Sequence, residues 1–257
     1  MIIRKKLLQL NSLKKRKALS SLLIVIIVAA VIVAVIGAAL VYFWLLPGNL
    51  KTEEMEFTDF TAVEVGWAFE VSITHSSSYS VIITADEKIF DHIEVTRNES
   101  KLVIGLDSSV IADGLFRKAE ITMPELDELG LSGATRGTVE GFSTSNPFTL
   151  SLSGASSLQM TNMNVGDADI EVSGASTLSA IGTANDLVSL VSGASDMDLS
   201  DFPVNNAEVN INGASQATIN VEGRLDAEVS GASSLQYLGD PTLGDINTSG
   251  GSTINKK

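Results

Sequence analysis

The chain of 257 residues contains no cysteine and few cations where its sequence is most regular. Without cysteine neither disulfides nor thiolate metal sites are available, so stability must come from a buried core. Between residues 131 and 255 the only basic residues are Arg136 and Arg224, and both histidines, His75 and His92, come earlier. This scarcity argues against a nucleic-acid surface, and no histidine of the regular region could activate a serine.

The charge balance is strongly acidic, with 31 acidic and 17 basic residues. Seven of the basic residues lie within residues 1–17, so the rest of the chain is more acidic still. Such a surface does not adsorb to nucleic acid or to anionic lipid. It suits solubility outside the cell, and it keeps strand edges from pairing with other chains.

A long uncharged run follows the basic segment, from residue 18 to residue 50. The part from Leu22 to Leu46 is almost wholly aliphatic and ends in an aromatic cluster, Tyr42 to Trp44. A cleaved secretory signal is the alternative, but its apolar core spans only about 7 to 15 residues. We therefore expect a single-pass signal anchor over 18–46 in the cell membrane, with a cytoplasmic basic tail (1–17), a short stalk (47–57) and an extracytoplasmic remainder.

A short motif recurs seven times after residue 130: an aliphatic residue, Ser or Asn, Gly, Ala, then Ser or Thr, with a degenerate last copy. Successive motif glycines lie 18 to 21 residues apart. They are Gly133, Gly154, Gly174, Gly193, Gly213, Gly231 and Gly250. A fixed period near 20 residues indicates one structural unit stacked on itself, that is, a solenoid.

Apolar residues alternate on both sides of each motif, as in Leu150 and Leu152 before Gly154 and in Leu158 and Met160 after it. This is the pattern of strands flanking a turn, and no stretch of the region has helical spacing. An all-β parallel β-helix over 131–257, with roughly 20 residues per coil, is the prediction. An antiparallel sandwich also has short, evenly spaced strands, but it gives no reason to repeat one turn seven times.

The recurrence of the same residue types in each copy of the motif predicts the backbone conformation and the hydrogen bonding of the turn. Gly at the same place in each copy indicates a positive φ. The Ala neighbour is small enough to lie inside a narrow corner, and the Ser, Thr and Asn side chains could form hydrogen-bond ladders from coil to coil.

Residues 58–130 are less regular and contain six alternating runs, at 62–65, 69–73, 79–83, 93–95, 101–104 and 119–124. They are expected to form the first, irregular coils of the same helix or a small sheet that caps its end.

These runs also carry a family resemblance. The pattern Phe60-x-x-Val-x-Val65, the later Leu102-x-Ile104 strand, the Met123-Pro-x-Leu126 connection and the serial Ser-Gly-Ala-Ser turns resemble the head GIN domain family of autotransporter-adhesin-like proteins. The resemblance covers about residues 57–255. It implies a right-handed β-helix at the cell surface or in the envelope, with a role in adhesion and no catalytic residues.

Acid pairs are the remaining candidates for a chemical site. Asp196, Asp198 and Asp201 supply hard oxygen ligands that suit calcium, although two acids on one strand are more often simply solvated. No phosphate-binding loop, zinc spacing or nucleophile elbow occurs, so no cofactor is expected.

Three functions remain open. The first is a non-catalytic binding, adhesion or scaffold module that contacts an envelope glycan or a surface protein. The second is a regulatory ectodomain coupled to a cytosolic partner through residues 1–17. The third is a polysaccharide-processing enzyme. The last coil could also be covered by a second copy of the chain, which would make a homo-oligomer.

Overall fold

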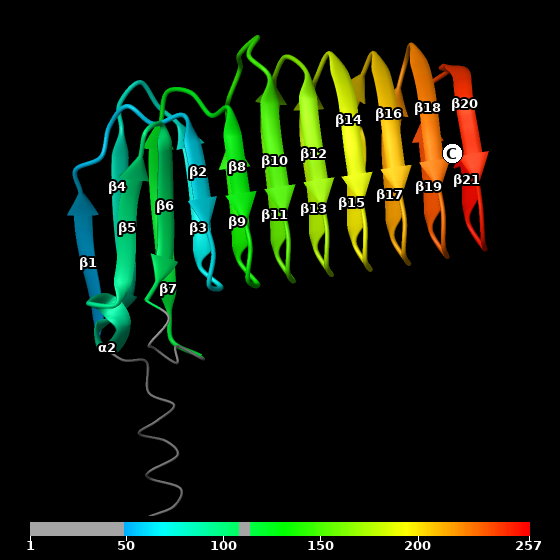
Figure 1. The fold of residues 1–257 in the computed structure, drawn as a ribbon. Helices are drawn as coiled ribbons and strands as arrows, with labels where there is room; N and C mark the ends of the chain where they lie inside the picture. Colours follow the sequence, from blue (N-terminus) through cyan, green and yellow to red (C-terminus); the bar gives the residue numbers. More distant parts are fainter. Residues whose placement is uncertain (1–48, 108–113) are drawn as a thin grey trace, which may run out of the picture. The chain divides into compact units, whose positions relative to one another are not determined.

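The computed structural model describes residues 49–107 and 114–257 (Figure 1). The predicted tail (1–17) and anchor (18–46) lie outside these residues. Within the described ranges, no helix is both long enough and apolar enough to cross a bilayer.

The described residues form an all-β solenoid of the right-handed type, with two walls (Figure 1). Sheet A has eleven strands and sheet B has ten. From β8 onward each turn of the chain adds one strand to sheet B and the next to sheet A, paired in parallel with the previous turn. The seven pairs are β8 (Glu128–Leu131) and β9 (Arg136–Glu140), β10 (Phe148–Leu152) and β11 (Ser157–Asn164), β12 (Ala168–Val172) and β13 (Thr177–Thr183), β14 (Asp186–Val191) and β15 (Asp196–Val204), β16 (Asn206–Ile211) and β17 (Gln216–Val221), β18 (Arg224–Val229) and β19 (Ser234–Leu238), and β20 (Thr242–Thr248) and β21 (Thr253–Lys256). This parallel pairing excludes the antiparallel sandwich.

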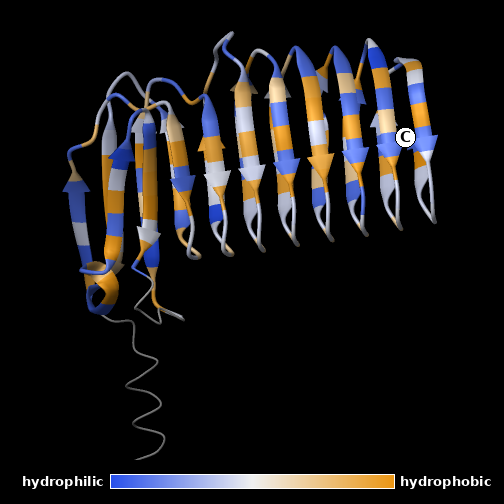
Figure 2. Ribbon diagram, viewed as in Figure 1, coloured by the Kyte–Doolittle hydropathy of each residue, from blue (hydrophilic) through white to orange (hydrophobic). Residues whose placement is uncertain are grey.

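The core fills the space between the two sheets. Alternation along each strand turns every second side chain inward, as the bands of Figure 2 show. The parallel register then places aliphatic side chains of successive coils next to one another. Leu152 pairs with Val172, and Val172 with Val191, and all three are fully buried. Each coil thus buries its apolar side chains against the coils on either side of it.

The N-terminal end combines coils and a cap. Its elements are β1 (Leu50–Met55), β2 (Ala62–Val65), β3 (Glu70–His75), β4 (Ser80–Asp86), α2 (Glu87–Phe90), β5 (Ile93–Asn98), β6 (Lys101–Leu106) and β7 (Arg117–Met123). The coil β2–β3 lies beside β8–β9, whereas the later coil β6–β7 lies on its other side, so spatial order departs from chain order. Antiparallel β1, β4 and β5 cover this end. Both expectations for residues 58–130, coils and a cap, therefore apply.

One correction concerns the predicted stalk (47–57). Residues 50–55 form β1, which pairs with β4 along its whole length. Alternation of side chains on this strand is weak because most of them are exposed and polar, which is why the sequence reads as a linker.

The seven motif glycines lie at the corners between the sheet B strand and the sheet A strand of each coil. All seven have a positive φ, between 65° and 82°. A Cβ added at Gly174 would lie 2.3 Å from the carbonyl oxygen of Gly154, and the same clash recurs from Gly193 to Gly174. Stacking at this distance leaves no room for a side chain.

Hydrogen bonds run through the corners from coil to coil, as predicted. The amide of Ser176 donates to Oγ of Ser195 at 3.4 Å, and the amide of Ser195 donates to Oγ of Ser215 at 3.3 Å. The Ala194 amide donates to the Gly174 carbonyl at 2.8 Å. The expectation that Ala lies inside the corner is wrong: the corner alanines are exposed, and the final Ser or Thr of the first six copies is buried. The Ser195 hydroxyl, for example, hydrogen-bonds the Ser176 amide and the Ser192 carbonyl, which an alanine side chain could not do.

Candidate functional site

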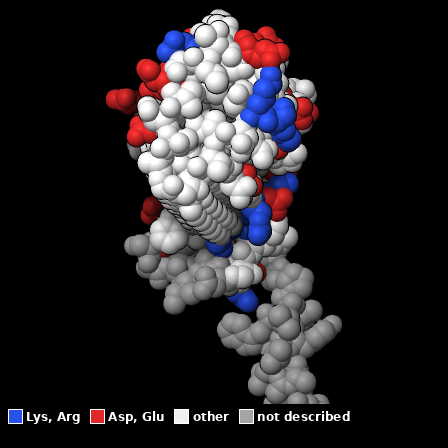
Figure 3. All heavy atoms as spheres, turned by 90° about the vertical axis from the view of Figure 1, so that its right-hand side faces the viewer, with Lys and Arg blue, Asp and Glu red and all other residues white. Residues whose placement is uncertain are grey.

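The outward side chains of the two sheets carry the chemistry that a partner could reach. The inward side chains form the core, and at the corners the residues exposed to solvent are mainly Gly and Ala, which offer little more than backbone groups. Figure 3, which looks along the stack from its C-terminal end, shows charged residues gathered on parts of the surface and an uncharged ridged edge. The two outer faces differ in composition, so each is described separately.

The outer face of sheet A consists largely of hydroxyl and amide side chains. The register places Thr138 beside Gln159 and Gln159 beside Ser179. Farther along, Thr218 lies beside Gln236. A groove of about 270 Å³ lies on this face, lined by Ser72, Ile73, Thr74, Thr138, Val139, Glu140, Gln159 and Thr161. The lining contains one carboxylate, so the groove offers hydrogen bonds with little charge.

The calcium candidates interrupt this face on β15. Asp196 and Asp198 are exposed on the same side of the strand, and the Asp198 carboxylate accepts the Ser200 amide at 3.0 Å. Asp201 follows after an irregularity in the pairing of β15. In residues 49–107 and 114–257 no group of three or more carboxylate, imidazole or thiol side chains is arranged to hold a metal ion. The three aspartates share a strand without forming a coordination shell.

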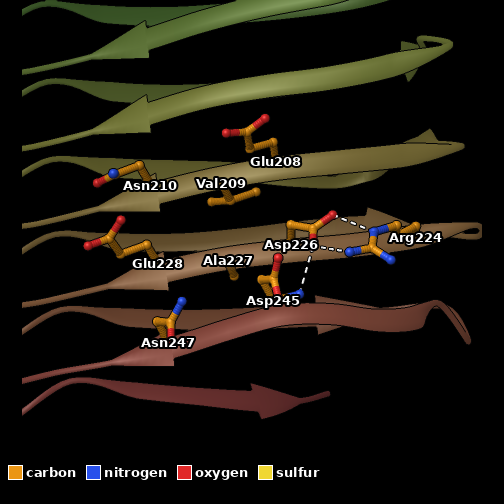
Figure 4. A pocket seen from close by; sticks show the side chains of 9 residues that line it. All are labelled: Glu208, Val209, Asn210, Arg224, Asp226, Ala227, Glu228, Asp245 and Asn247. Atoms are coloured by element: carbon orange, nitrogen blue, oxygen red, sulfur yellow. Dashed lines mark hydrogen bonds and ion pairs between the residues drawn. The ribbon is translucent and has the colours of Figure 1, made fainter.

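The outer face of sheet B is acidic toward its C-terminal end. Figure 4 shows a groove of about 350 Å³ across β16, β18 and β20. Its charged lining residues are Glu208, Arg224, Asp226, Glu228 and Asp245. Four carboxylates and one guanidinium give the groove a net negative charge.

Arg224 is held by its neighbour on the same strand. Its Nε and Nη2 donate to the two carboxylate oxygens of Asp226, both at 2.7 Å, and the Asp245 amide donates to the same carboxylate at 2.7 Å. These bonds, the one from Arg224 foremost, lower the pKa of Asp226, and the same carboxylate raises the pKa of Arg224. Because the guanidinium is already paired, the groove keeps its acidic character.

β14 departs from the pattern of its neighbours. Val188 and Leu190 point outward and are exposed, whereas Ser189 points inward and is buried. The Ser189 hydroxyl is the one buried side-chain polar atom of the described residues without a hydrogen-bond partner. The strand is apolar on both faces, so alternation alone gave no sign of this arrangement.

The two histidines lie apart from any nucleophile. His75 ends β3, and its ring packs edge-on against Phe142 with centroids 5.7 Å apart. His92 lies between α2 and β5. Neither imidazole hydrogen-bonds to a serine or a carboxylate in the described part of the chain, so no activated nucleophile is assembled there.

The sequence did not reveal an eighth corner, between β2 and β3. The register aligns Gly66-Trp67-Ala68 with Ser132-Gly133-Ala134, so Trp67 stands where the seven coils from β8–β9 onward have Gly. Trp67 keeps the corner conformation, with φ of 62°, and half of its surface is exposed. Two features of the sequence could have indicated this corner: the alternation of apolar residues in the flanking strands, and the Ala that it shares with the later corners.

The fold and its faces define a class of protein: a two-walled β-solenoid whose accessible chemistry is repeated in rows of outward side chains. Residues 59–241 match the family model described as "Putative auto-transporter adhesin, head GIN domain". Because the match covers most of the chain, the protein belongs to this family, as the motifs of its sequence indicated. A comparison with curated protein sequences gave no match.

Solved structures share the fold at low sequence identity. A "putative adhesin" from Bacteroides fragilis superposes with a TM-score of 0.76 at 21% identity, covering 81% of this chain and 97% of that one. A "putative lipid binding protein" from Parabacteroides distasonis gives 0.64 at 19%, covering 82% and 97%. A "putative adhesin" from the same species gives 0.64 at 14%, covering 82% and 98%. These similarities establish the architecture.

Proposed function

We propose that this protein is a membrane-anchored, extracytoplasmic and non-catalytic binding module, and that the outer face of sheet A holds a neutral envelope glycan. The anchor is the apolar segment 18–46, with residues 1–17 on the cytoplasmic side. The observation that carries the proposal is the presence on sheet A of two in-register rows of hydroxyl and amide side chains, Thr138-Gln159-Ser179 and Thr218-Gln236, with Asp198 between them.

Regular spacing suits an extended ligand. Neighbouring strands lie about 4.8 Å apart, so equivalent side chains recur at that interval along the stack. Each hydroxyl or amide contributes a modest hydrogen bond, and several in a row give useful affinity without a deep pocket. A polymer with many hydroxyl groups fits such a face better than a compact ligand does.

The contrast with sheet B supports the choice of face. Its carboxylates would repel an acidic glycan, and its one cation in the groove is already paired with Asp226. A neutral glycan gains most where polar groups are dense and charge is sparse, which describes the groove that contains Thr138 and Gln159.

Membership of an adhesin family supports binding rather than catalysis. The outward rows of hydroxyl and amide side chains are suited to contact with an extended partner. A binding role therefore explains the outward polar side chains of sheet A without requiring a catalytic group.

The test is binding of the full chain, reconstituted in lipid nanodiscs, to an array of neutral and acidic glycans. The double substitution Thr138→Ala and Gln159→Ala should weaken binding to neutral glycans about tenfold, as expected for two lost hydrogen bonds. The matched control, Thr149→Ala with Asn210→Ala, likewise removes one threonine and one carboxamide side chain, but from the outer face of sheet B. Equal losses in both variants, or no glycan bound, would contradict the proposal.

A regulatory role is the second candidate, because seven basic residues are concentrated in 1–17 next to the predicted anchor. Deletion of 1–17 separates the two functions. A regulator would lose its signalling phenotype while the ectodomain stays displayed and still binds glycan, whereas a simple binding module would lose nothing.

A further inference from the structure

Three exposed apolar side chains gather at one edge of the solenoid, where the described part of the chain begins. Leu50, Trp67 and Phe116, here called the corner patch, are 53%, 50% and 42% exposed. Trp67 and Phe116 are the only large aromatic side chains among the strongly exposed hydrophobic residues of the described ranges. Apolar side chains that are exposed side by side do not stabilise the core, and such patches commonly mark a site of interaction.

The sheet places the three side by side. Strands β1, β4, β7 and β3 are consecutive neighbours in sheet A, and all four have one end at the corner edge. Leu50 pairs with Asp86 of β4, and the Asp86 amide donates to the Phe116 carbonyl at 2.9 Å. The Arg117 guanidinium donates to the carbonyl of Trp67. Two backbone contacts and one side-chain hydrogen bond thus link the three positions across neighbouring strands.

Trp67 is held there against its own conformational preference. Trp67 and Ala68 both have a positive φ, of 62° and 56°, which residues with a side chain rarely adopt. The indole lies against the backbone of Gly105, and its outer half contacts nothing in the described structure. Residues in such conformations cluster at functional sites, and at this corner the conformation presents an indole at the surface.

The charges around the patch are compatible with a lipid headgroup layer. Asp86, between Leu50 and Phe116, is buried, and its carboxylate accepts the Lys88 amide at 3.0 Å, so it does not oppose contact. A groove of about 200 Å³ beside Phe116 is lined by two guanidinium groups, Arg117 and Arg136, and by one carboxylate, Glu70, so the balance of charge in its lining suits phosphate oxygens.

The short connection between the proposed anchor and β1 keeps the corner patch close to the membrane. Only Pro47, Gly48 and Asn49 separate Leu46, the last residue of the proposed anchor, from Leu50. Four residue steps span at most about 14 Å when fully extended. Leu50 therefore cannot leave the neighbourhood of the membrane surface, and indole rings prefer the interface between lipid and water.

We propose that the corner patch rests in the interfacial layer of the bilayer that holds the anchor, so that the solenoid stands with its corner edge toward the membrane. This rests on the membrane anchoring proposed above. The sheet faces then project sideways from the membrane and stay open to a ligand.

The chain contains two tryptophans, Trp44 in the proposed anchor and Trp67 in the patch, so each can be read alone. The full chain is reconstituted in phosphatidylcholine vesicles whose acyl chains are brominated near the headgroup, and tryptophan fluorescence is compared with that in unbrominated vesicles. In Trp44→Phe, which leaves Trp67, bromine should reduce the emission at least about twofold, because an interfacial indole lies at that depth. In Trp67→Phe, quenching of Trp44 reports the anchor itself.

Quenching of Trp44 without quenching of Trp67 would overturn the corner patch proposal and leave the anchor intact. Absence of both would overturn the anchor as well. Trp67 shielded from aqueous acrylamide but not quenched by bromine would mean that a protein, such as a second copy, covers the patch, which also overturns the proposal. As a control, Leu243→Trp in a chain with both tryptophans changed to Phe places an indole at a similarly exposed site at the start of β20, away from the corner edge. Equal quenching there would mean that the chain adsorbs to the vesicle without a preferred edge, which would also overturn the proposal.

Discussion

The first corner of the solenoid and the seven later corners have the same backbone course and different side chains. Later corners place Gly at the positive-φ position and, in five consecutive copies from Ser156 to Ser233, a buried serine two residues on. The first corner has Trp67 and Phe69 at these positions. The later corners are shaped by contact with the coil before them, whereas in the described part of the chain no motif corner is stacked before the first one, which can carry an indole.

The difference shows where the fold tolerates variation. At Gly193 the preceding coil's carbonyl occupies the place that a Cβ would need, so the stack itself excludes a side chain. At Trp67 the backbone conformation is equally unusual, but the side chain has space to point outward. Stacking, rather than φ alone, makes Gly obligatory.

The largest expected effect comes from breaking a later corner. Gly193→Val would place Cβ 2.3 Å from the Gly174 carbonyl oxygen and impose a β-branched side chain at φ of 82°. We expect a loss of at least about 4 kcal/mol in the free energy of unfolding, measured by chemical denaturation. The control is Gly114→Ala, where φ is also positive and nothing lies within 4 Å, and which should cost about 1 kcal/mol. Similar losses in the two variants would show that φ alone decides.

The next effect comes from the serine ladder. Ser195→Ala removes the acceptor of the Ser176 amide and the donor to the Ser192 carbonyl, so it should cost about 1 to 3 kcal/mol. Ser189→Ala is the matched control, because Ser189 is equally buried but its hydroxyl has no partner among the described residues. That variant should be neutral or more stable in the same denaturation assay. A loss at Ser189 as large as at Ser195 would contradict the role of the ladder.

The repeat allowed the solenoid, its corners and its ladders to be predicted from sequence because stacking forces the same residues to recur. Two features had no such signal. The coil β6–β7 lies outside β2–β3, and alternation within a strand does not say which strand is its neighbour. Trp67 does not fit the motif that marks the seven corners from β8–β9 onward. The outward row on sheet A could be foreseen only in part, since the period-two pattern gives the face of each residue but not the register between coils.

A smaller effect is expected when the first corner is converted to the repeated form. Trp67→Gly relieves a left-handed conformation that costs about 1 to 2 kcal/mol, but it removes a half-buried indole and adds a flexible Gly, which together cost about the same. Stability should therefore change by about 1 kcal/mol or less. A loss as large as that of Gly193→Val would mean that Trp67 serves mainly the fold.

The smallest effect is expected on the outer face, far from any corner. Asp226→Asn removes the partner of Arg224, and the lowered pKa of Asp226 fixes the direction of the pH dependence. The stabilisation is fully present above the ordinary value of 3.8 and is lost as the pH falls through the lowered pKa of the folded state. The difference in Tm between the two proteins should be small at pH 7, decrease with salt, and vanish in strong acid. A difference that grows in acid would contradict the pairing.

Engineered cysteines test the stacking of the corners most directly, because the natural chain has none. Ala155 and Ala175 occupy successive corners, where Cα atoms about 4.8 Å apart lie within the range that a disulfide can bridge. The account predicts that Ala155→Cys with Ala175→Cys forms an intramolecular disulfide on mild oxidation. Ala155→Cys with Ala194→Cys, one coil farther apart, should remain reduced. Equal oxidation of the two pairs, or none in the first, would contradict a single column of corners.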